Sequence, residues 1–587
     1  MDETSNYQFK INNIVLKNSK IIKPNKITVF VGANNCGKTQ LLKDIIEYIS
    51  KEHSQLVILD DLDIAYPITY EEFVEIYPLK YREGDGLIRY YNIAPTLDRV
   101  GSQKIFNSVK EMENQLKQKF SLKNQEFLHM IGEEMITFLS TDNRLNLVKK
   151  HKIDNYAVEG PKDILSALYD KDSKIVSLIE EKVKKIFNIN IYFDSSEPGV
   201  LQFRVGKDFS NISSNNQDAY KQLSKYKLLD DQGDGLRSFV GILTAIISLP
   251  RPVILLDEPE AFLHPPQAMQ LGAVIAELIN DSQQIFISTH SADFLRGLLS
   301  ATKDAEIVHL SREGEKNTNV RVLNNEMLNK IIADPLLSSS RVLEGMFYKG
   351  VVATEADADA LFYQRLYQMI GSSDEIHFIN AHNKQTLKKI IEPYKSLGIR
   401  YALIADADVI RDKHEFMDII KLITDEEIRD TILQERTQVY DFFKKKDKKT
   451  ILFELQSNIK QLAIQELPTN NEEVERVLYK FRKELKKLRD DSDELAIFKQ
   501  DGRAALTIEL QKKFDDLWNH CAGYGLFIVS VGELESWLID YGIDRKSNKS
   551  KWISEALNKL YEIDVDSKKE IWKFMNSLKE YFYTVDN

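Results

Sequence analysis

An eight-residue loop near the N-terminus constrains the fold of this chain more than any other feature. Residues 32–39 read GANNCGKT and fit the pattern G-x-x-x-x-G-K-[ST] in full. They follow an apolar, β-branched run at 27–31 and precede apolar residues at helical spacing from Leu41. A strand, a glycine-rich turn and a helix in this order form a loop whose backbone N–H groups hold phosphate. The loop therefore predicts an α/β domain with a nucleotide site.

The side chains of this loop have distinct predicted roles in binding ATP with Mg²⁺. Lys38 is expected to reach the β- and γ-phosphates, and Thr39 is expected to bind the magnesium ion. The residues predicted to contact the nucleotide are Gly32, Asn35, Gly37, Lys38, Thr39 and Gln40.

Two apolar runs far downstream end in polar side chains that complete such a site. Residues 253–257 form a predicted strand that ends in Asp257, and Glu258 follows it. An acid at such a strand end holds Mg²⁺, and the next acid orients the attacking water. Residues 284–288 form another predicted strand, which His290 follows after one residue. We expect His290 to contact the γ-phosphate of the same nucleotide.

These motifs resemble those of ABC-type ATPase heads in the group that includes SMC, Rad50 and the OLD (overcoming lysogenization defect) family. In that group a signature stretch precedes the acidic strand. Its counterpart here is 231–238, which departs from the standard LSGGQ but keeps Gly233 and Gly235 before a predicted helix. The resemblance implies that this stretch contacts nucleotide bound to a partner head, in a homodimer or higher homo-oligomer. Gln103 is one option for the Q-loop glutamine.

A second set of predicted strands alternates with helices and indicates another parallel sheet. Its strands are 350–354, 376–380 and 400–405. Glu355 follows the first strand, and Asp406 and Asp408 follow the third. The ends of neighbouring parallel strands face one crevice, where gathered carboxylates repel one another unless cations such as Mg²⁺ or Mn²⁺ neutralise them. Two such ions about 4 Å apart can clamp the attacking and leaving oxygens of a phosphodiester.

The order of a glutamate after the first strand and Asp-x-Asp after the third resembles a Toprim domain, as in the OLD-type nucleases. Ala356 stands where the family usually has glycine. OLD-type nucleases add a later acidic motif and a lysine. The metal ligands that the resemblance implies are Glu355, Asp359, Asp406, Asp408, Glu533 and Glu535. The lysine is Lys549 or Lys551, which is expected to stabilise charge developing on the phosphorane.

Composition and charge exclude several classes of protein. Of 587 residues only Cys36 and Cys521 are cysteines, which excludes a disulfide framework and a cysteine-rich zinc site. A net charge of −11 excludes a uniformly basic coat for nucleic acid. The longest apolar stretch, 239–249, is about half a membrane span, and residues 1–4 show no secretory signal. We therefore expect a cytoplasmic protein without a membrane partner.

The α/β patterns predict two domains. The first, residues 1–340, is expected to be an ABC-type ATPase domain with a helical arm insertion at about 103–190. The second, residues 345–587, is expected to be a Toprim domain with a helical insertion at about 412–520. Within that insertion a basic run at 444–449 favours a solvated helix face, with phosphate binding as the alternative.

The resemblance covers most of the chain. It implies an ATP-regulated, divalent-metal-dependent endonuclease that cuts DNA, with RNA as the lesser alternative, in bacterial anti-phage defence. It also implies a possible defence partner, such as a retron reverse transcriptase with its msDNA or a helicase.

Three other functions remain open. The first is an ATPase switch whose Toprim domain binds a ligand or partner without cutting. The second is strand passage or priming, for which the sequence shows neither a nucleophilic-tyrosine domain nor template-binding elements. The third is an SMC-like organiser of DNA, which the short arm disfavours.

Overall fold

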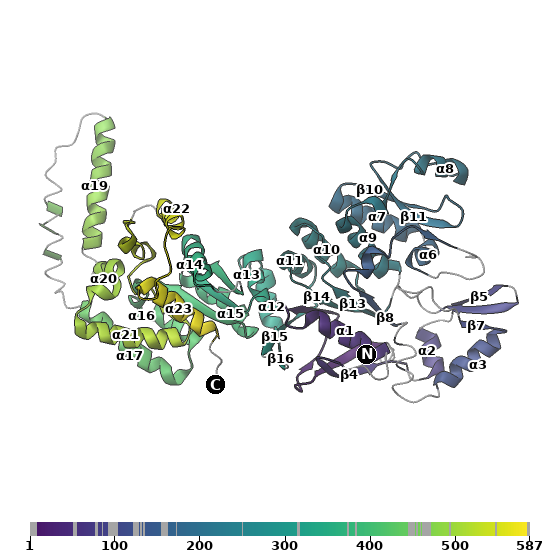
Figure 1. Cartoon of the computed structure of the whole chain (residues 1–587), viewed down its shortest axis with the longest axis horizontal. Helices are drawn as coiled ribbons and strands as arrows, with labels where there is room; N and C mark the ends of the chain where they lie inside the picture. The colour runs from purple at the N-terminus through teal and green to yellow at the C-terminus, as the bar shows by residue number, and fades with distance from the viewer. Residues whose placement is uncertain are drawn as a thin grey trace. The chain divides into compact units, whose positions relative to one another are not determined.

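The computed structural model describes most of residues 9–583. The gaps fall at 51–55, 68, 77–79, 85, 92–103, 121–127, 129–131, 133–134, 154–162, 172, 249–250, 314–316, 372–374, 382–383, 444–451, 454–455, 458, 461–470, 492–494 and 546–548. The chain divides into two compact units, Met1–Phe347 and Tyr348–Asn587. Both mix helices and strands, as Figure 1 shows, so the predicted α/β class is confirmed. None of the helices in the described part combines the length and apolar character that a bilayer crossing requires.

A six-stranded sheet forms the centre of the first unit. Its strand order is β16-β15-β3-β14-β13-β8, and every neighbouring pair except β15–β16 is parallel. The strands are β3 (Ile27–Val31), β8 (Ile136–Leu139), β13 (Val253–Asp257), β14 (Gln284–Ser288), β15 (Ala305–Glu313) and β16 (Asn317–Val322). Every residue of β3, β13 and β14 is buried, as expected for parallel strands covered on both faces. Their carboxyl ends meet at one edge, where the predicted nucleotide residues follow.

The helix that begins at Lys38 is held between two sheets. This helix, α1 (Lys38–Ser50), contacts β13 and β14 on one side and β4 on the other. β4 belongs to a smaller antiparallel sheet of order β2-β1-β4. That sheet consists of β1 (Lys10–Leu16), β2 (Ile21–Ile22) and β4 (Leu59–Ala65). One hydrophobic cluster joins all three layers and fixes the first turn of α1 beneath the phosphate loop.

The expected helical insertion at 103–190 is wrong for part of its length. β8 lies within it and forms the edge of the central sheet, paired with β13. β8 has only four residues, too few to give a periodic signal, and a strand far downstream decides its place in the sheet. The other elements there are β7 (Lys104–Phe106), α3 (Val109–Phe120), β9 (His151–Lys152), α6 (Ile164–Tyr169) and α7 (Ser173–Phe187). Gln103 lies outside the described residues.

The remaining elements of the first unit surround this core. Its helices are α2 (Tyr70–Ile76), α8 (Asn216–Leu223), α9 (Asp234–Ser248), α10 (Pro265–Leu278), α11 (Ala292–Ala301), α12 (Asn325–Ala333) and α13 (Ser340–Glu344). Its small antiparallel sheets use β5 (Lys80–Gly84) and β6 (Leu87–Tyr91) with β7, and β10 (Asn190–Asp194), β11 (Val200–Gly206) and β12 (Lys227–Leu228) with β9.

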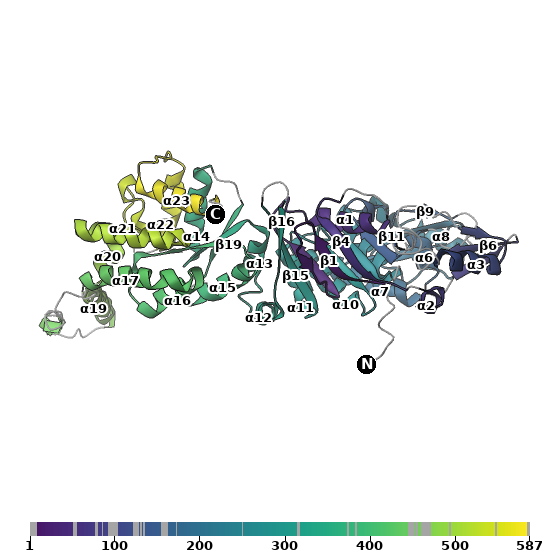
Figure 2. The same cartoon turned by 90° about the horizontal axis from the view of Figure 1, so that it is seen from below.

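Four parallel strands in the order β18-β17-β19-β20 form the sheet of the second unit. They are β17 (Gly350–Thr354), β18 (Ile376–Asn380), β19 (Arg400–Ala405) and β20 (Leu526–Ile528). Figure 2 shows α14 (Asp357–Met369), α22 (Lys549–Leu560) and α23 (Glu570–Tyr583) on one side of this sheet. On the other side lie α15 (Lys384–Ser396), α16 (Lys413–Ile423) and α17 (Glu426–Phe443).

Helices occupy the described part of the chain between β19 and β20. After α16 and α17 come α19 (Asn471–Asp491), α20 (Ala496–Asp501) and α21 (Ile508–Gly523). α20 matters for the site below, because it contacts the short helical turn at Ala407–Ile410 that follows β19. The basic run at 444–449 lies outside the described residues.

Candidate functional site

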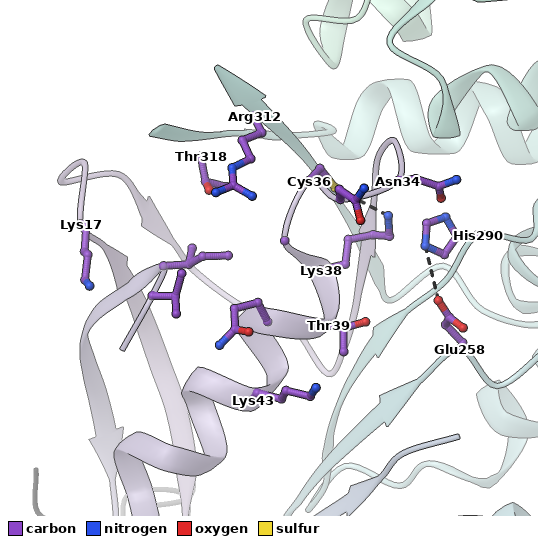
Figure 3. Close-up of a pocket in the computed structure, with 15 residues that line it drawn as sticks. Lys17, Asn34, Cys36, Lys38, Thr39, Lys43, Glu258, His290, Arg312 and Thr318 are labelled. Atoms are coloured by element: carbon purple, nitrogen blue, oxygen red, sulfur yellow. Dashed lines mark hydrogen bonds and ion pairs between the residues drawn. The ribbon is translucent and has the colours of Figure 1, made fainter. Parts of the chain in front are cut away.

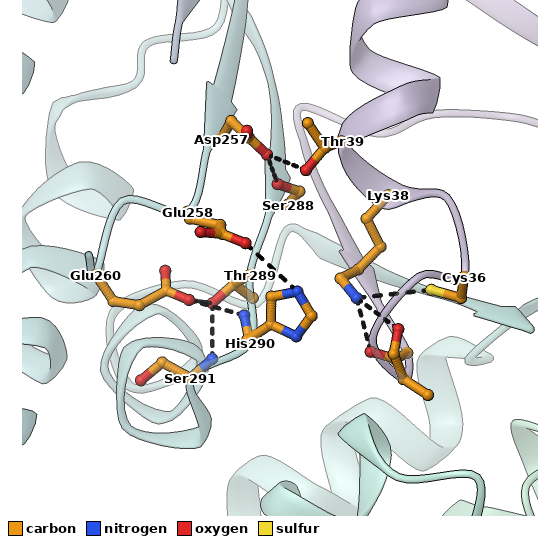
Figure 4. Close-up of polar contacts among 12 residues, drawn as sticks. Cys36, Lys38, Thr39, Asp257, Glu258, Glu260, Ser288, Thr289, His290 and Ser291 are labelled. Atoms are coloured by element: carbon orange, nitrogen blue, oxygen red, sulfur yellow. Dashed lines mark hydrogen bonds and ion pairs between the residues drawn. The ribbon is translucent and has the colours of Figure 1, made fainter. Parts of the chain in front are cut away.

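The phosphate loop of the first unit has the geometry that its sequence predicts. Gly32 and Gly37 have φ angles of 140° and 104°, and Asn35 has a φ of 62°. The Lys38 ammonium donates to the carbonyl oxygens of Gly32 at 2.7 Å and Ala33 at 3.0 Å, so the loop curls around it (Figure 4). Burial lowers the pKa of Lys38, while the neighbouring Cys36 thiol and acidic residues act in the opposite direction. The cation is held by neutral oxygens and faces an anion site.

The two predicted magnesium ligands of this unit lie together. The Thr39 hydroxyl donates to Asp257 Oδ1 at 2.7 Å, and the Ser288 hydroxyl donates to the same oxygen (Figure 4). Thr39 lies in the first turn of α1, whereas Asp257 and Ser288 end neighbouring parallel strands. Asp257 is buried and lies beside the start of the helix that receives phosphate. Three elements thus bring hard oxygen donors together where an ATP-bound Mg²⁺ sits in P-loop proteins.

Glu258 and His290 face each other across the end of the sheet. The distance from His290 Nε2 to Glu258 Oε1 is 3.5 Å, and Glu258 has a φ of 45° (Figure 4). Burial and the Lys38 ammonium lower the pKa of His290 to about 4, so the imidazole is neutral at pH 7. The backbone N–H of His290 donates to Glu260 Oε1 at 2.7 Å, and the Thr289 hydroxyl donates to the same oxygen at 2.9 Å. Glu260 therefore fixes the turn that presents His290.

A buried arginine hydrogen-bonds to the backbone of the two acids at the end of β13. Arg144 is fully buried and donates to the carbonyl oxygens of Asp257 at 2.6 Å and Glu258 at 2.7 Å. Burial lowers its pKa to about 10, against the attraction of Glu260 and Asp257. The guanidinium remains charged at pH 7 and fixes the backbone between these two acids.

A cavity of about 1120 Å³ opens above the phosphate loop (Figure 3). Its lining includes Asn35, Gly37, Lys38, Thr39, Gln40, Glu258 and His290 from the predicted set. Outside that set, Lys17, Lys43 and Arg312 bring further positive charge, and Val57 and Ile58 bring apolar surface. Basic groups beside an apolar wall suit a nucleoside triphosphate. Gly32 and Asp257 lie at the base, next to Lys38 and Thr39 respectively, rather than in the lining.

Gly233 and Gly235 are not part of this cavity lining. They stand at the start of α9, with Gly233 just before the helix. A Cβ at Gly235 would lie 2.5 Å from the carbonyl oxygen of Phe262, whereas a Cβ at Gly233 would meet nothing within 4 Å. Within one chain, therefore, Gly235 packs closely against the turn after Glu258, and neither glycine lines the cavity above the phosphate loop.

In the second unit, a half-buried and a buried carboxylate follow the first strand of the sheet. Glu355 comes directly after β17, and Asp359 lies in the first turn of α14 with 6% of its surface exposed. Asp359 Oδ2 accepts from the backbone N–H of Ala356 at 3.0 Å. Its other oxygen lies 2.8 Å from the ammonium of Lys549, at the start of α22. Although burial acts to lower it, the pKa of Lys549 is raised by Asp359 and Asp406.

The Asp-x-Asp pair after β19 completes an acidic centre. Burial, followed by repulsion from Glu355 and Asp359, raises the pKa of Asp406 well above its ordinary value. Asp408 Oδ2 accepts from the ammonium of Lys499, on α20, at 2.9 Å. The carboxylates thus lie close enough to repel one another. Lys549 contacts Asp359, and Lys499 contacts Asp408.

The later acidic motif also reaches this centre. Glu533 and Glu535 follow β20, and Glu533 has a raised pKa from burial and from Glu535, opposed by Lys499. Lys551 is exposed, whereas Lys549 contacts Asp359. Of the two lysine candidates, Lys549 is the one placed at the carboxylates.

The acidic centre has the right donors for a hard divalent cation but not yet the right spacing. Its side chains offer carboxylate oxygens, which Mg²⁺ and Mn²⁺ prefer. Among the described residues, however, no group of three or more possible ligands lies close enough to hold a metal ion. The expected two-metal arrangement is therefore not seen among these residues.

Sequence reasoning missed Arg144, Glu260 and Lys499. Arg144 and Lys499 lie in segments without a motif and reach the sites only through long-range packing. Glu260 stands two residues after Glu258, so proximity to the acidic pair was a usable signal for it.

Comparison with known families matches each unit separately. Residues 27–296 match a family model described as "AAA domain, putative AbiEii toxin, Type IV TA system". Residues 346–408 match the Toprim domain of overcoming lysogenization defect protein-like proteins. These two ranges contain the phosphate loop with its acidic partners, and the first two acidic motifs of the second unit.

Two curated proteins are similar to parts of the chain. The Old nuclease of Escherichia phage P2 is 25% identical over 168 residues, which is 27% of this chain and 28% of that protein. The chain thus matches less than a third of that relative's length. An ATP/GTP phosphatase of Helicobacter pylori is 22% identical over 324 residues, covering 50% of this chain and 88% of that protein.

Solved structures similar to this chain are SMC heads. A head bound to the C-winged helix domain of ScpA has a TM-score of 0.31 at 15% identity and covers 55% of this chain and 99% of its own. The SMC head domain of Thermotoga maritima has a TM-score of 0.28 at 11% identity, with coverages of 54% and 99%. Such TM-scores are too low to support an argument. The two domain matches show an ATPase domain and an OLD-like Toprim domain in one chain, and this order matches that of OLD-family ATPase–Toprim fusions.

Proposed function

We propose that this chain is an ATP-regulated, divalent-metal-dependent endonuclease. One observation carries the proposal: carboxylates from the ends of β17 and β19 and from the loop after β20 gather around the ammonium groups of Lys499 and Lys549. They do so in a domain of the OLD-like Toprim family, in the same chain as a complete phosphate loop. Carboxylates at neighbouring strand ends are the ligand set that phosphodiester hydrolysis with divalent ions uses.

The first unit would bind and hydrolyse ATP. Lys38 holds the β- and γ-phosphates in the cavity, and Thr39 and Asp257 hold the magnesium ion of the nucleotide. Glu258 orients the attacking water, and the neutral His290 ring beside it contacts the γ-phosphate. Arg144 keeps the backbone of the two acids in place while charge changes in front of them.

The second unit would cut the phosphodiester. Glu355, Asp359, Asp406 and Asp408 would hold the divalent ions, with Glu533 and Glu535 beside them. Bound ions would supply a water of lowered pKa and neutralise charge on the attacked phosphate. Lys549, which contacts Asp359, would stabilise the additional negative charge of the phosphorane.

Pairing of two ATPase units would complete the nucleotide site. Gly233 and Gly235 stand at an exposed helix start and not at the phosphate loop of their own chain. This placement supports a role opposite the nucleotide of a second copy, in a homodimer or a higher homo-oligomer. Light scattering of Glu258→Gln protein should show a mass increase with ATP and Mg²⁺ that Lys38→Ala protein lacks.

The substrate and biological role follow from the family. We propose DNA, with RNA as the lesser alternative, and a role in bacterial anti-phage defence in the cytoplasm. A retron reverse transcriptase with its msDNA, or a helicase, is the kind of partner that would trigger such an effector. Co-purification of the tagged chain with the products of neighbouring genes tests the partner directly.

A cleavage assay tests the central proposal. Wild type, Lys38→Ala and Asp406→Ala are incubated with supercoiled plasmid and short single- and double-stranded DNA and RNA. Each reaction contains Mg²⁺ or Mn²⁺ and is run with and without ATP. We expect cutting by wild type and none by Asp406→Ala, and the Lys38→Ala lanes give the sign of ATP control. Cutting that persists in Asp406→Ala would overturn the assignment of the Toprim centre.

A second candidate function is an ATPase switch whose Toprim domain binds a ligand or partner without cutting. The observation in its favour is that lysines contact Asp359 and Asp408 and that no three-ligand group is formed among the described residues. ATP hydrolysis without cleavage of any substrate, even with a co-purified partner, would select this function over the first.

A further inference from the structure

We propose that Lys499 is a built-in counter-cation of the Toprim centre, and that a divalent ion must displace its ammonium from Asp408 to bind there. The proposal rests on the metal-dependent function above and adds a residue from the helical segment between β19 and β20. Its ammonium lies 2.9 Å from Asp408 Oδ2.

The backbone around Lys499 is fixed to the loop that follows β20. A Cβ at Gly532, which has a φ of 102°, would lie 2.3 Å from the carbonyl oxygen of Lys499. A Cβ at Gly502 would lie 2.1 Å from the carbonyl oxygen of Ser530, and the Arg503 N–H donates to that same oxygen at 2.7 Å. Only glycine permits these approaches, so the two segments are in direct backbone contact.

The same loop also fixes the other half of the ion pair. The N–H of Ala407, between the two aspartates, donates to the carbonyl oxygen of Gly532 at 2.7 Å. Phe498, next to Lys499, is fully buried and packs on Phe443 and Phe514 with ring centroids 5.1 and 5.7 Å apart. Lys499 and Asp408 are therefore both anchored to the loop at Gly532, and their contact is determined by the fold.

The exposure of this pair argues against a purely stabilising role. The side chains of Lys499 and Asp408 are 40% and 15% exposed, and an ion pair with so much solvent contributes little to folding. Its effect on the local charge is larger, because the Lys499 ammonium interacts electrostatically with three acids of the centre, namely Asp408, Asp406 and Glu533. The ammonium supplies positive charge that a divalent ion would otherwise supply, at an oxygen that the ion would need.

If the Lys499 ammonium competes with a metal ion, removing its charge should increase the affinity for Mn²⁺. Lys499→Met keeps the length and removes the charge, so Mn²⁺ should bind about tenfold more tightly than to wild type, since one repelling charge is gone. Lys499→Arg keeps the charge and should restore affinity close to that of wild type. Lys512→Met, an exposed lysine on α21, controls for the change in net charge.

Calorimetric titration of the full chain with Mn²⁺, without nucleotide, tests the proposal. Asp406→Asn identifies the binding that belongs to the Toprim centre, and melting temperatures verify that each variant is folded. Tighter binding in Lys499→Met only, reversed in Lys499→Arg, is the expected result. Binding that depends on Asp406 but is equal or weaker in Lys499→Met overturns this proposal alone. Absence of any Asp406-dependent binding overturns the metal centre of the proposed function and this inference with it.

Discussion

The two candidate sites lie at the carboxyl ends of parallel strands, but their lysine side chains contact different kinds of group. In the ATPase unit Lys38 is held by neutral carbonyl oxygens and keeps its charge for an incoming anion. In the Toprim unit Lys499 and Lys549 are each held by a carboxylate. The same topology thus yields one site prepared for phosphate and another whose ligands are already paired. The side chains at the strand ends, rather than the topology of the sheet, determine which kind of site forms.

The largest expected effect concerns the acid that faces His290. Glu258→Gln removes the carboxylate that we propose orients the attacking water but keeps its size, so steady-state ATP hydrolysis should fall about 10³-fold, as for loss of a catalytic base. Release of inorganic phosphate at saturating ATP measures it. A rate within threefold of wild type would mean that another group orients the water. The same variant leaves the acidic centre of the Toprim unit unchanged.

The next effect separates the two lysine candidates of the Toprim unit. Lys549→Met should lower DNA cleavage about 10²-fold, because the cation that we propose stabilises charge on the attacked phosphate is lost. Lys551→Met should have a much smaller effect, since that side chain is exposed. Initial rates of plasmid nicking with Mn²⁺ compare them. Equal losses in both variants would contradict the contact seen with Asp359.

Residues that belong to a local sequence pattern could be predicted from the sequence, whereas features that depend on distant partners could not. Lys38, Asp257 and Glu258 were predictable because a short motif, or the end of an apolar strand, fixes each of them locally. Asp406 and Asp408 were predictable for the same reason. The helical insertion of the first unit was predicted wrongly where β8 joins the central sheet, because the partner strand is far away.

Two cations, Arg144 and Lys499, could not be predicted from the sequence because their partners lie far away along the chain. Arg144 contacts acids 113 and 114 positions away, and Lys499 contacts an aspartate 91 positions away. No spacing rule connects such pairs before the fold is known. The distance between carboxylates in the Toprim centre was likewise beyond the sequence, which indicated only that they share an edge.

Arg144→Met tests how rigid the ATPase site must be. The change leaves two buried carbonyl oxygens without their donor, so we expect a loss of about 3 kcal/mol in stability of the first unit. Differential scanning calorimetry should show one transition shifted to lower temperature, with the other unchanged. Lys185→Met, at an exposed position on α7, is the control. A loss below about 1 kcal/mol would mean that the backbone holds without the arginine.

Two neighbouring glycines provide a matched pair. Gly235→Ala places a Cβ 2.5 Å from the Phe262 carbonyl oxygen, whereas Gly233→Ala meets nothing within 4 Å. We expect the first to cost about 1–2 kcal/mol of stability, as overpacking does, and the second to leave the melting temperature unchanged. Thermal denaturation without nucleotide measures both. Equal melting temperatures would show that the turn after Glu258 adjusts freely.

The smallest effect is the pH dependence that His290 adds to stability. Its pKa is about 4 in the folded chain and about 6.5 when unfolded, so the unfolded state binds the proton first as pH falls. The stability of wild type relative to His290→Gln should therefore decrease between pH 6.5 and pH 4. We expect about 1 kcal/mol, because the ring is 31% exposed and solvent screens it. Urea denaturation at pH 7 and pH 4.5 measures the difference, and parallel curves would contradict it.

The position of β3 has a consequence for how the protein is made. The strand that leads into the phosphate loop pairs with β14 on one edge and with β15 on the other. Both partners lie more than two hundred residues later in the chain, so β3 has no strand to pair with until Ser288 ends β14, and its second edge is covered only when β15 ends at Glu313. At 5–20 residues per second, ATP cannot bind for roughly 15 to 60 s of synthesis. Nucleotide binding thus reports that the strands on both sides of β3 have been made.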